Sequence, residues 1–288
     1  MLLLATSLLP ASTYADEGGA SDVQITPKIS VRGPRGRGGG KPSAVATGVL
    51  GSSPPDSSRR WAVVIGISDY AGTSNDIRYA DDDALDMLNT LTVVYGYKRE
   101  NILLLISDYA VNNATKADII AAIDWLRGVE AAGDEVIFFY SGHGARGRAN
   151  DGDKEAVDEA IVPYECTSSS LIWDGDLRSM FNDFDTSRII FIFDSCYAGG
   201  MTDLKATGRI IAMACSESGL SYEGDAWQNG QFTYYFVDEG MLQGLADRYD
   251  NIGGVPDVTV EEASDYAKAK CAYQTPAISD SFKNDLLP

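Results

Sequence analysis

Five stretches of the chain are almost continuously apolar, and they alternate with stretches in which apolar residues recur every three or four positions. The first pattern is typical of strands buried on both faces of a parallel sheet, and the second of amphipathic helices. The apolar stretches predict strands over residues 61–67, 101–107, 135–141, 188–194 and 209–215. The periodic stretches predict helices over residues 81–94, 115–129, 177–184, 232–246 and 260–270, with Thr115 as an N-cap. This alternation predicts an α/β fold with a doubly wound sheet.

The start of the chain departs from this pattern. Residues 1–15 form a short apolar run that ends in small residues, which favours an export signal and a secreted or cell-surface protein. The run lacks a preceding basic region, so a chance apolar terminus is the alternative. Residues 16–58 are rich in glycine, serine and proline and show neither period, which predicts a flexible propeptide or linker. We therefore expect the folded domain over residues 59–288, with no membrane span in it.

Charge is strongly asymmetric along the chain. There are 42 acidic and 23 basic residues, for a net charge of −19. This balance argues against a nucleic-acid partner, because a phosphate backbone requires a basic surface. Seven of the basic residues fall within residues 28–60, so a basic N-terminal segment precedes a strongly acidic domain.

The four cysteines follow no CxxC spacing, which argues against the common zinc and redox motifs. Cys215 continues an apolar strand and is expected in the core. If the protein is exported, one disulfide is conceivable, and Cys166 and Cys271, in polar contexts, are the pair to test first.

Two predicted strands end in sequences suited to chemistry. Strand 135–141 runs into SGHG, which holds the only histidine, His143, and strand 188–194 runs into DSCYAGG, which holds Cys196. The carboxyl ends of parallel strands meet at one edge of a sheet, so these side chains are expected to lie together. A histidine beside a cysteine can act as base for a thiolate nucleophile. The N–H groups of Gly144 and Cys196 would then stabilise the oxyanion. A lone histidine or cysteine is more often structural, but their joint occurrence favours catalysis.

These two motifs resemble those of the caspase-like cysteine peptidases, a superfamily that includes caspases, metacaspases, clostripain and legumain. SGHG follows an FFY strand, and DSCYAGG follows an IIFIFD strand. The resemblance covers residues 59–288 and implies a caspase-like sheet of about six mostly parallel strands, flanked by helices on both faces. It also implies a His143–Cys196 dyad. Asp194 stands where caspases have glutamine, and in this respect the chain is most similar to metacaspases.

The same resemblance assigns three residues to the pocket for the P1 side chain. These are Asp83, in the segment after the first strand, Ser141, two residues before the histidine, and Asp194. Two carboxylates in one partly buried slot are costly unless a cation neutralises them. We therefore expect arginine or lysine at P1.

Alternatives remain for some of these acids. Asp81 and Asp82 are equally well explained as acids at a helix N-terminus, where the dipole favours them, so only Asp83 and Asp194 are assigned to the pocket. Arg78 favours a second possibility, because legumain carries an arginine nearby and accepts asparagine.

A calcium site is also implied by the resemblance, since metacaspase-like enzymes are often activated by calcium. Asp158, Asp174 and Asp203 fall at matching places, and Asp176 is expected to replace the acid missing at Gly175. Carboxylates from several loops suit this hard cation. Asp151 and Asp153 could add ligands, although their spacing is not that of an EF-hand. A solvated acidic surface is the alternative explanation.

Together these observations predict an exported cysteine endopeptidase that cleaves after arginine or lysine, activated by calcium and made as a zymogen. The basic N-terminal segment would be an inhibitory propeptide that the enzyme cuts itself, or alternatively a solubilising linker or tether. A legumain-like peptidase or transpeptidase acting after asparagine is the second prediction. A non-catalytic calcium- or peptide-binding module on the same fold is the third.

Overall fold

A six-stranded sheet forms the centre of the computed structural model, which describes residues 21–31, 46–111, 113–152, 156–247 and 257–288. The strand order is β13-β10-β9-β5-β3-β4. Five strands run parallel, and β13 pairs antiparallel with β10 at one edge. The strands are β3 (Arg60–Ile67), β4 (Ile102–Ser107), β5 (Glu135–Ser141), β9 (Ile189–Asp194), β10 (Arg209–Met213) and β13 (Ala277–Asp280). This confirms the predicted fold class and five of its strands.

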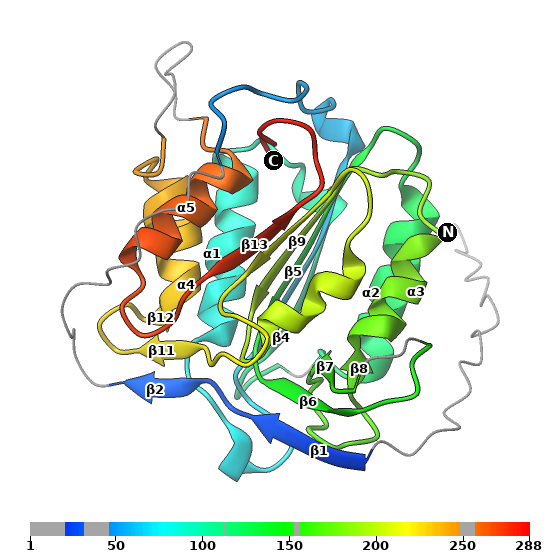
Figure 1. Cartoon of the computed structure of the whole chain (residues 1–288), viewed down its shortest axis with the longest axis vertical. Coiled ribbons are helices and arrows are strands. Elements are labelled where there is room, and N and C mark those ends of the chain that lie inside the picture. The colour runs from blue at the N-terminus through cyan, green and yellow to red at the C-terminus, as the bar shows by residue number, and fades with distance from the viewer. Residues whose placement is uncertain (1–20, 32–45, 112, 153–155, 248–256) are drawn as a thin grey trace, which may run out of the picture.

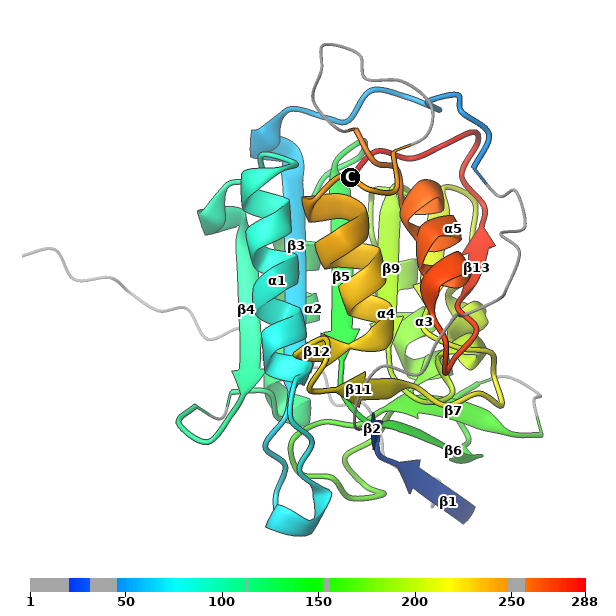
Figure 2. The ribbon, with the colours of Figure 1, turned by 90° about the vertical axis from the view of Figure 1, so that its left-hand side faces the viewer.

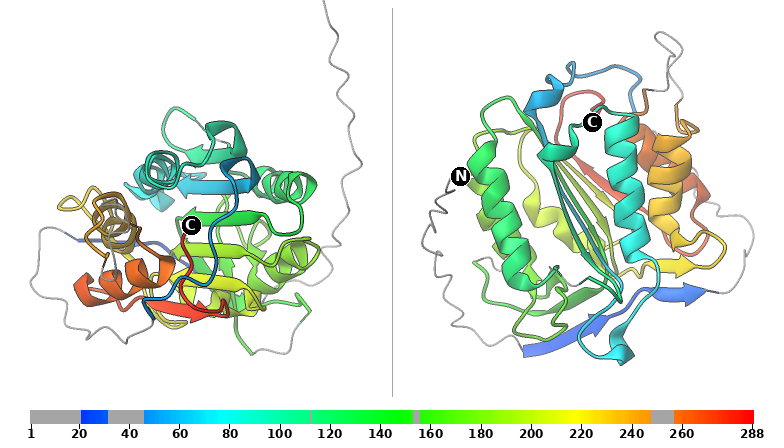
Figure 3. Two further views of the ribbon diagram at one scale, coloured as in Figure 1. Left: turned by 90° about the horizontal axis from the view of Figure 1, so that it is seen from above. Right: turned by 180° about the vertical axis from the view of Figure 1, so that it is seen from behind.

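Helices cover both faces of the sheet (Figures 1 and 3). One face carries α1 (Ala80–Val93), α4 (Gln231–Thr233), which continues as the π-helix Tyr234–Leu242, and α5 (Val260–Lys270). The other face carries α2 (Lys116–Val129) and α3 (Asp174–Asn182). Short 3₁₀ helices lie at Ser57–Arg59, Thr73–Asn75, Arg99–Asn101 and Ala198–Leu204. The predicted N-cap Thr115 is confirmed, because its side chain and that of Asp118 form a capping box at the start of α2.

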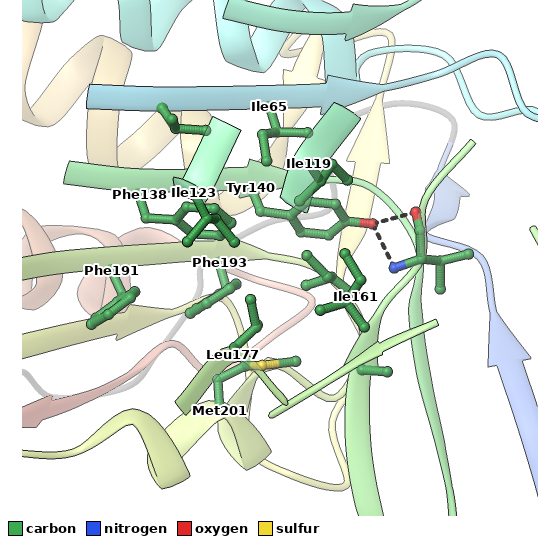
Figure 4. Packing of buried hydrophobic residues seen from close by; sticks show 14 of the residues in the cluster. Ile65, Ile119, Ile123, Phe138, Tyr140, Ile161, Leu177, Phe191, Phe193 and Met201 are labelled. Atoms are coloured by element: carbon green, nitrogen blue, oxygen red, sulfur yellow. Dashed lines mark hydrogen bonds between the residues drawn. The ribbon is translucent and has the colours of Figure 1, made fainter. Parts of the chain in front are cut away.

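The core is divided into two apolar clusters, one on each side of the sheet. Along β5, Phe138 and Tyr140 belong to one cluster, whereas Ile137 and Phe139 belong to the other. This alternation arises because successive side chains of a strand point to opposite faces. Figure 4 shows the first cluster, in which Phe138 and Tyr140 pack with residues of α2 and α3. Burial on both faces explains why these strands are apolar at nearly every position.

Two small sheets lie at the carboxyl ends of the parallel strands (Figures 1 and 2). Their orders are β1-β6-β7-β8 and β12-β11-β2. Their strands are β1 (Ser21–Thr26), β2 (Ile29–Val31), β6 (Gly144–Arg148), β7 (Asp158–Ile161), β8 (Ile172–Trp173), β11 (Tyr222–Gly224) and β12 (Asn229–Gly230). None of these strands was predicted, because each is short and lacks a clear period.

The first two strands fall inside residues 16–58, which were expected to be flexible. β1 and β2 are held by hydrogen bonds to strands more than 100 residues away, and a local sequence pattern does not reveal such pairing. The predicted export signal, residues 1–15, lies outside the described residues, and so export remains a prediction. No helix among the described residues is long and apolar enough to cross a membrane.

The four cysteines all lie in the described part of the chain and are free. The suggested pairing of Cys166 with Cys271 is therefore wrong. Cys271 is buried at the end of α5, with its thiol directed at the carbonyl of Gln231, instead of being exposed as its polar neighbours suggested. Cys215 belongs to the core, as predicted.

Candidate active site

The register of the central strands brings His143 and Cys196 to the same edge. Ser141 at the end of β5 pairs with Asp194 at the end of β9, and each dyad residue lies two positions further on. Gly144 makes the closest approach, since a Cβ atom there would lie 1.9 Å from the carbonyl oxygen of Cys196. Any larger residue would push the two segments apart. Both predicted catalytic residues are buried, with about 1% of their surface exposed.

The imidazole of His143 is fixed by two residues that the sequence did not reveal. Its ring stacks on Tyr70 with the centroids 4.1 Å apart, and its Nε2 lies 2.6 Å from the carbonyl oxygen of Asn75. A carbonyl only accepts, so Nε2 carries the proton and Nδ1 is the unprotonated nitrogen. Nδ1 is buried and has no hydrogen-bond partner among the described residues. Burial lowers the pKa of His143 to about 4, so the ring is neutral at pH 7 and Nδ1 can accept a proton.

The thiol of Cys196 contacts the N-terminal segment. Its Sγ lies 3.4 Å from the carbonyl oxygen of Pro27 and accepts a hydrogen bond from the backbone N–H of Ser221 at 3.3 Å. Burial raises the pKa of the thiol to about 11. With the site covered in this way, the predicted nucleophile and its predicted base are both neutral.

A lysine occupies the three residues predicted for the P1 pocket. The Nζ of Lys28 lies 3.0 Å from a carboxylate oxygen of Asp83, 3.1 Å from one of Asp194 and 2.7 Å from the hydroxyl of Ser141. The Lys28, Asp83 and Asp194 side chains are fully shielded from solvent. We call Asp83, Ser141 and Asp194 the basic-residue site. The described structure thus brings together all three predicted pocket residues around one ammonium group.

Further donors hold the two carboxylates in place. The N–H of Gly230 donates to Asp83 at 2.8 Å, and the N–H and hydroxyl of Thr233 donate to Asp194 at 3.1 and 2.7 Å. The hydroxyl of Ser221 donates to the other oxygen of Asp194. Gly230 also leaves room, since a Cβ atom there would lie 2.2 Å from Asp194. These residues stand in no recognisable motif, and so no sequence pattern pointed to them.

The charges of the basic-residue site depend on one another. Burial alone would lower the pKa of Lys28, but the nearby Asp194 and Asp83 carboxylates outweigh it and raise that pKa above its usual value. Burial raises the pKa of Asp83 to about 7, although Lys28 opposes this rise. Removing the ammonium group would leave two carboxylates facing each other without compensation.

The neighbouring charged residues are directed elsewhere. Asp81 is hydrogen-bonded to Ser68, and Asp82 lies in the first turn of α1, so the helix-terminus explanation fits both acids. Arg78 is exposed and forms an ion pair with Asp225. The feature that suggested asparagine specificity therefore lies outside the basic-residue site.

A second group of acids lies beside the small sheet. Ligand oxygens of Asp151, Asp158 and Asp174 lie within 4.8 Å of one another. We call these three residues the acidic cluster. Asp151 fills the place of the acid missing at Gly175, since a Cβ atom on that glycine would lie 2.6 Å from its carboxylate. Two of the four predicted calcium ligands, Asp158 and Asp174, are thus brought together.

The other two predicted ligands are not part of this cluster. Asp203 forms an ion pair with Arg178, and Asp176 is outside the group of acids whose oxygens converge. One oxygen of Asp174 is buried without a hydrogen-bond partner in the described structure. Burial, together with Asp151 and Glu159, raises the pKa of Asp174 to about 9. The donor set therefore fits a hard cation such as Ca²⁺.

Comparisons with solved structures agree with this architecture. A protein of Geobacter sulfurreducens matches with a TM-score of 0.57 at 18% identity, over 79% of this chain and 95% of that one. Caspase-1 from Spodoptera frugiperda matches with a TM-score of 0.50 at 11% identity, over 80% of this chain and 89% of that one. At such identities the likeness is one of fold.

Sequence comparisons are more specific. The chain is 35% identical over 176 residues to Metacaspase-1 of Kluyveromyces lactis, and the aligned region covers 59% of this chain and 39% of that protein. It is 36% identical over 151 residues to Metacaspase-1B of Aspergillus oryzae, and the aligned region covers 51% of this chain and 36% of that protein. The chain therefore matches less than half the length of these relatives. Residues 60–205, which contain His143 and Cys196, match the model of the metacaspase peptidase C14 domain, and the chain belongs to this family.

Proposed function

We propose that this protein is a cysteine endopeptidase that cleaves peptide bonds after lysine or arginine. The observation that carries this proposal is the position of Lys28. Its ammonium group lies between two buried carboxylates and a hydroxyl, and the backbone next to it contacts the thiol of Cys196. A substrate lysine in the same place would bring its own peptide bond to the nucleophile.

The dyad would act as base and nucleophile. Nδ1 of His143 accepts the thiol proton, and the thiolate attacks the carbonyl carbon that follows the basic residue. The N–H groups of Gly144 and Cys196 donate to the oxyanion. The imidazolium returns the proton to the departing amine, which leaves a thioester. Water then hydrolyses the thioester, releasing the carboxylic acid and restoring the thiol.

Electrostatics favour a basic side chain over the alternatives. Asparagine would leave the carboxylates of Asp83 and Asp194 without a counter-charge, and an acidic side chain would add a third carboxylate. This argues against the legumain-like alternative. The non-catalytic alternative is disfavoured by the arrangement of His143, whose Nδ1 is oriented by Asn75 and buried without a partner.

The test is a panel of fluorogenic peptides that differ only at P1, with lysine, arginine, asparagine or aspartate. We expect turnover of the lysine and arginine peptides only. Cys196→Ala and His143→Ala should abolish it, whereas Cys215→Ala, which removes a core thiol of the same region, should not. Preferred cleavage after asparagine, or full activity of Cys196→Ala, would contradict the proposal.

We further propose that the acidic cluster binds Ca²⁺. The supporting observation is the unpartnered, buried oxygen of Asp174 next to two more carboxylates. A bound cation would neutralise these charges and hold the start of α3 against β7. Asp176 and Asp203 remain candidates for additional ligands.

Thermal unfolding tests this cation site without relying on activity. In the Cys196→Ala background, we expect millimolar CaCl₂ to raise the melting temperature by about 5 °C relative to chelator, as for a ligand near 100 times its Kd. Asp174→Asn should remove the rise, and Asp183→Asn, an exposed acid at the end of the same helix, should keep it. If the Cys196→Ala protein has the same melting temperature with CaCl₂ and with chelator, calcium binding is refuted.

A further inference from the structure

Residues 21–31, which we call the N-terminal strap, cross the active site along two different strands (Figures 1 and 2). Its first half, β1, pairs antiparallel with β6, where Thr26 lies opposite Gly144. Its second half, β2, pairs parallel with β11, where Ile29 lies opposite Tyr222. The residue that fills the basic-residue site lies between the two halves.

The strap does not present the peptide bond that a lysine-specific peptidase would cut. Cleavage after Lys28 requires the carbonyl of Lys28 at the thiol, with its oxygen facing the N–H groups that stabilise the oxyanion. The carbonyl oxygen that lies 3.4 Å from Sγ instead belongs to Pro27, which precedes the lysine. The N–H of Ile29, which belongs to the bond after the lysine, donates to Ser221 at 2.9 Å.

This difference corresponds to a reversal of chain direction. The Cα atom of any residue lies between two carbonyl groups, one before it and one after it. If a lysine keeps its ammonium group in the same place while the chain runs the other way, the two carbonyls exchange positions. A cleavable substrate would therefore place its preceding residues along β11, where the strap places its following residues.

We propose that the N-terminal strap binds in the direction opposite to that of a cleavable substrate, so that Lys28 blocks the active site as an inhibitor that is not cut. This inference rests on the proposed cleavage after basic residues. The nearest bond, between Pro27 and Lys28, is also protected. In cleavage there Pro27 would occupy P1, yet Pro27 is exposed and the basic-residue site is filled by the next residue.

Several contacts hold the strap in addition to the buried ion pairs. The hydroxyls of Thr26 and Tyr197 are 2.8 Å apart, and the hydroxyl of Ser30 donates to Glu223 at 2.7 Å. A segment tethered to the domain competes at an effective concentration of about 1 mM. The inhibition is therefore competitive, because a substrate lysine and Lys28 bind to the same carboxylates.

Kinetics of the full chain test this inhibition. Relative to the parent protein, Lys28→Ala should lower the KM for a lysine peptide at least about tenfold and leave kcat unchanged. Lys28→Arg should stay inhibited. Gln24→Ala, at an exposed position of the strap, should behave like the parent protein. Equal KM values for Lys28→Ala and the parent would overturn the proposal.

Mass spectrometry tests the direction of binding. Intact mass measured while a lysine peptide is being turned over should show the bond between Lys28 and Ile29 uncut in the parent protein. A cut at this bond as the first event would mean that the strap is a substrate, and would overturn the proposal. Ile29→Pro removes the N–H donated to Ser221 and should lower KM as Lys28→Ala does, which provides a second variant if Lys28→Ala unfolds.

Alkylation of Cys196 by iodoacetamide, followed by peptide mapping, separates this inference from the proposed function. If no variant cleaves any peptide but Lys28→Ala is alkylated at least about tenfold faster, the peptidase proposal fails and the strap remains a cover over the thiol. If lysine peptides are cleaved but Lys28→Ala changes neither KM nor alkylation, the peptidase proposal stands and the strap proposal fails.

Discussion

The basic-residue site and the proposed catalytic dyad are neighbours, yet burial has opposite effects on the charges of their side chains. In the basic-residue site, Lys28 forms ion pairs with two carboxylates, and these raise the pKa of Lys28 so that its positive charge is retained. In the proposed dyad, burial lowers the pKa of His143 to about 4 and raises that of Cys196 to about 11, so neither group is charged at pH 7. The difference is whether a buried group has a counter-charge within reach.

This contrast has a functional meaning. The proposed recognition of basic side chains would depend on this counter-charge, because the two carboxylates outweigh the effect of burial and keep the Lys28 ammonium group charged. The proposed dyad would depend more on access, because a thiol shielded from water resists ionisation. In the described structure, Lys28 thus fills the proposed recognition site while the predicted nucleophile is neutral.

Neutralising a carboxylate of the basic-residue site should have the largest effect. Asp83→Asn leaves a basic side chain with one counter-charge, and we expect kcat/KM for lysine peptides to fall about 100- to 1,000-fold, the usual cost of breaking a buried charge pair. Asp82→Asn, the adjacent acid on α1, serves as the matched control and should change little. Equal losses in the two variants would mean that no specific charge pairing exists.

Uncovering the dyad should have the next largest effect. In Lys28→Ala the strap no longer covers Cys196, and this exposure should lower the pKa of the thiol from about 11 towards that of an ordinary thiol, near 8.5, by more than the lost Lys28 charge raises it. The full shift would raise the thiolate fraction at pH 7 by about 300-fold. The pH dependence of alkylation measures this shift. Cys215, whose pKa burial raises to about 12, lies in the core and should keep its low reactivity. If the pH dependence of Cys196 alkylation is the same in Lys28→Ala and the parent protein, the strap does not control the ionisation of the thiol.

The smallest effect concerns stability and pH. The folded pKa of His143 lies below its unfolded value near 6.5, so the unfolded chain binds more protons between pH 6.5 and 4. Stability from this group is present above pH 6.5 and is lost as pH falls towards 4. We expect the parent protein to lose about 2 kcal/mol more than His143→Asn between pH 7 and pH 5 in urea unfolding. Parallel losses would show that the imidazole is not buried.

The sequence revealed those features whose residues lie close together along the chain. Buried strands are apolar at nearly every position, and His143 and Cys196 stand in glycine-rich turns directly after two of them. Asp194 and Ser141 end the same strands, but only the resemblance to metacaspases assigned them to a pocket. The physical cause is that a parallel sheet aligns the carboxyl ends of its strands without further information.

The features that the sequence did not reveal depend on distant contacts. The partner of His143 is the backbone carbonyl of Asn75, and every residue type carries such a carbonyl. Lys28 lies in a segment that looks unstructured until β6 and β11 are in place beside it. Asp151 was expected only as an additional ligand, and its place in the acidic cluster, where Asp176 was the expected replacement, depends on the fold of its loop.

Gly230 suggests how the proposed preference for basic side chains could be redesigned. Its backbone has an ordinary φ of −60°, so a side chain there meets no conformational obstacle, only the atoms of Lys28, Asp83 and Asp194. The absence of a side chain at Gly230 thus leaves the space in which a long basic side chain fits. Gly230→Ala would press against the Asp194 carboxylate and reduce the space for long cations, which makes this glycine a position at which the proposed preference for basic side chains could be altered.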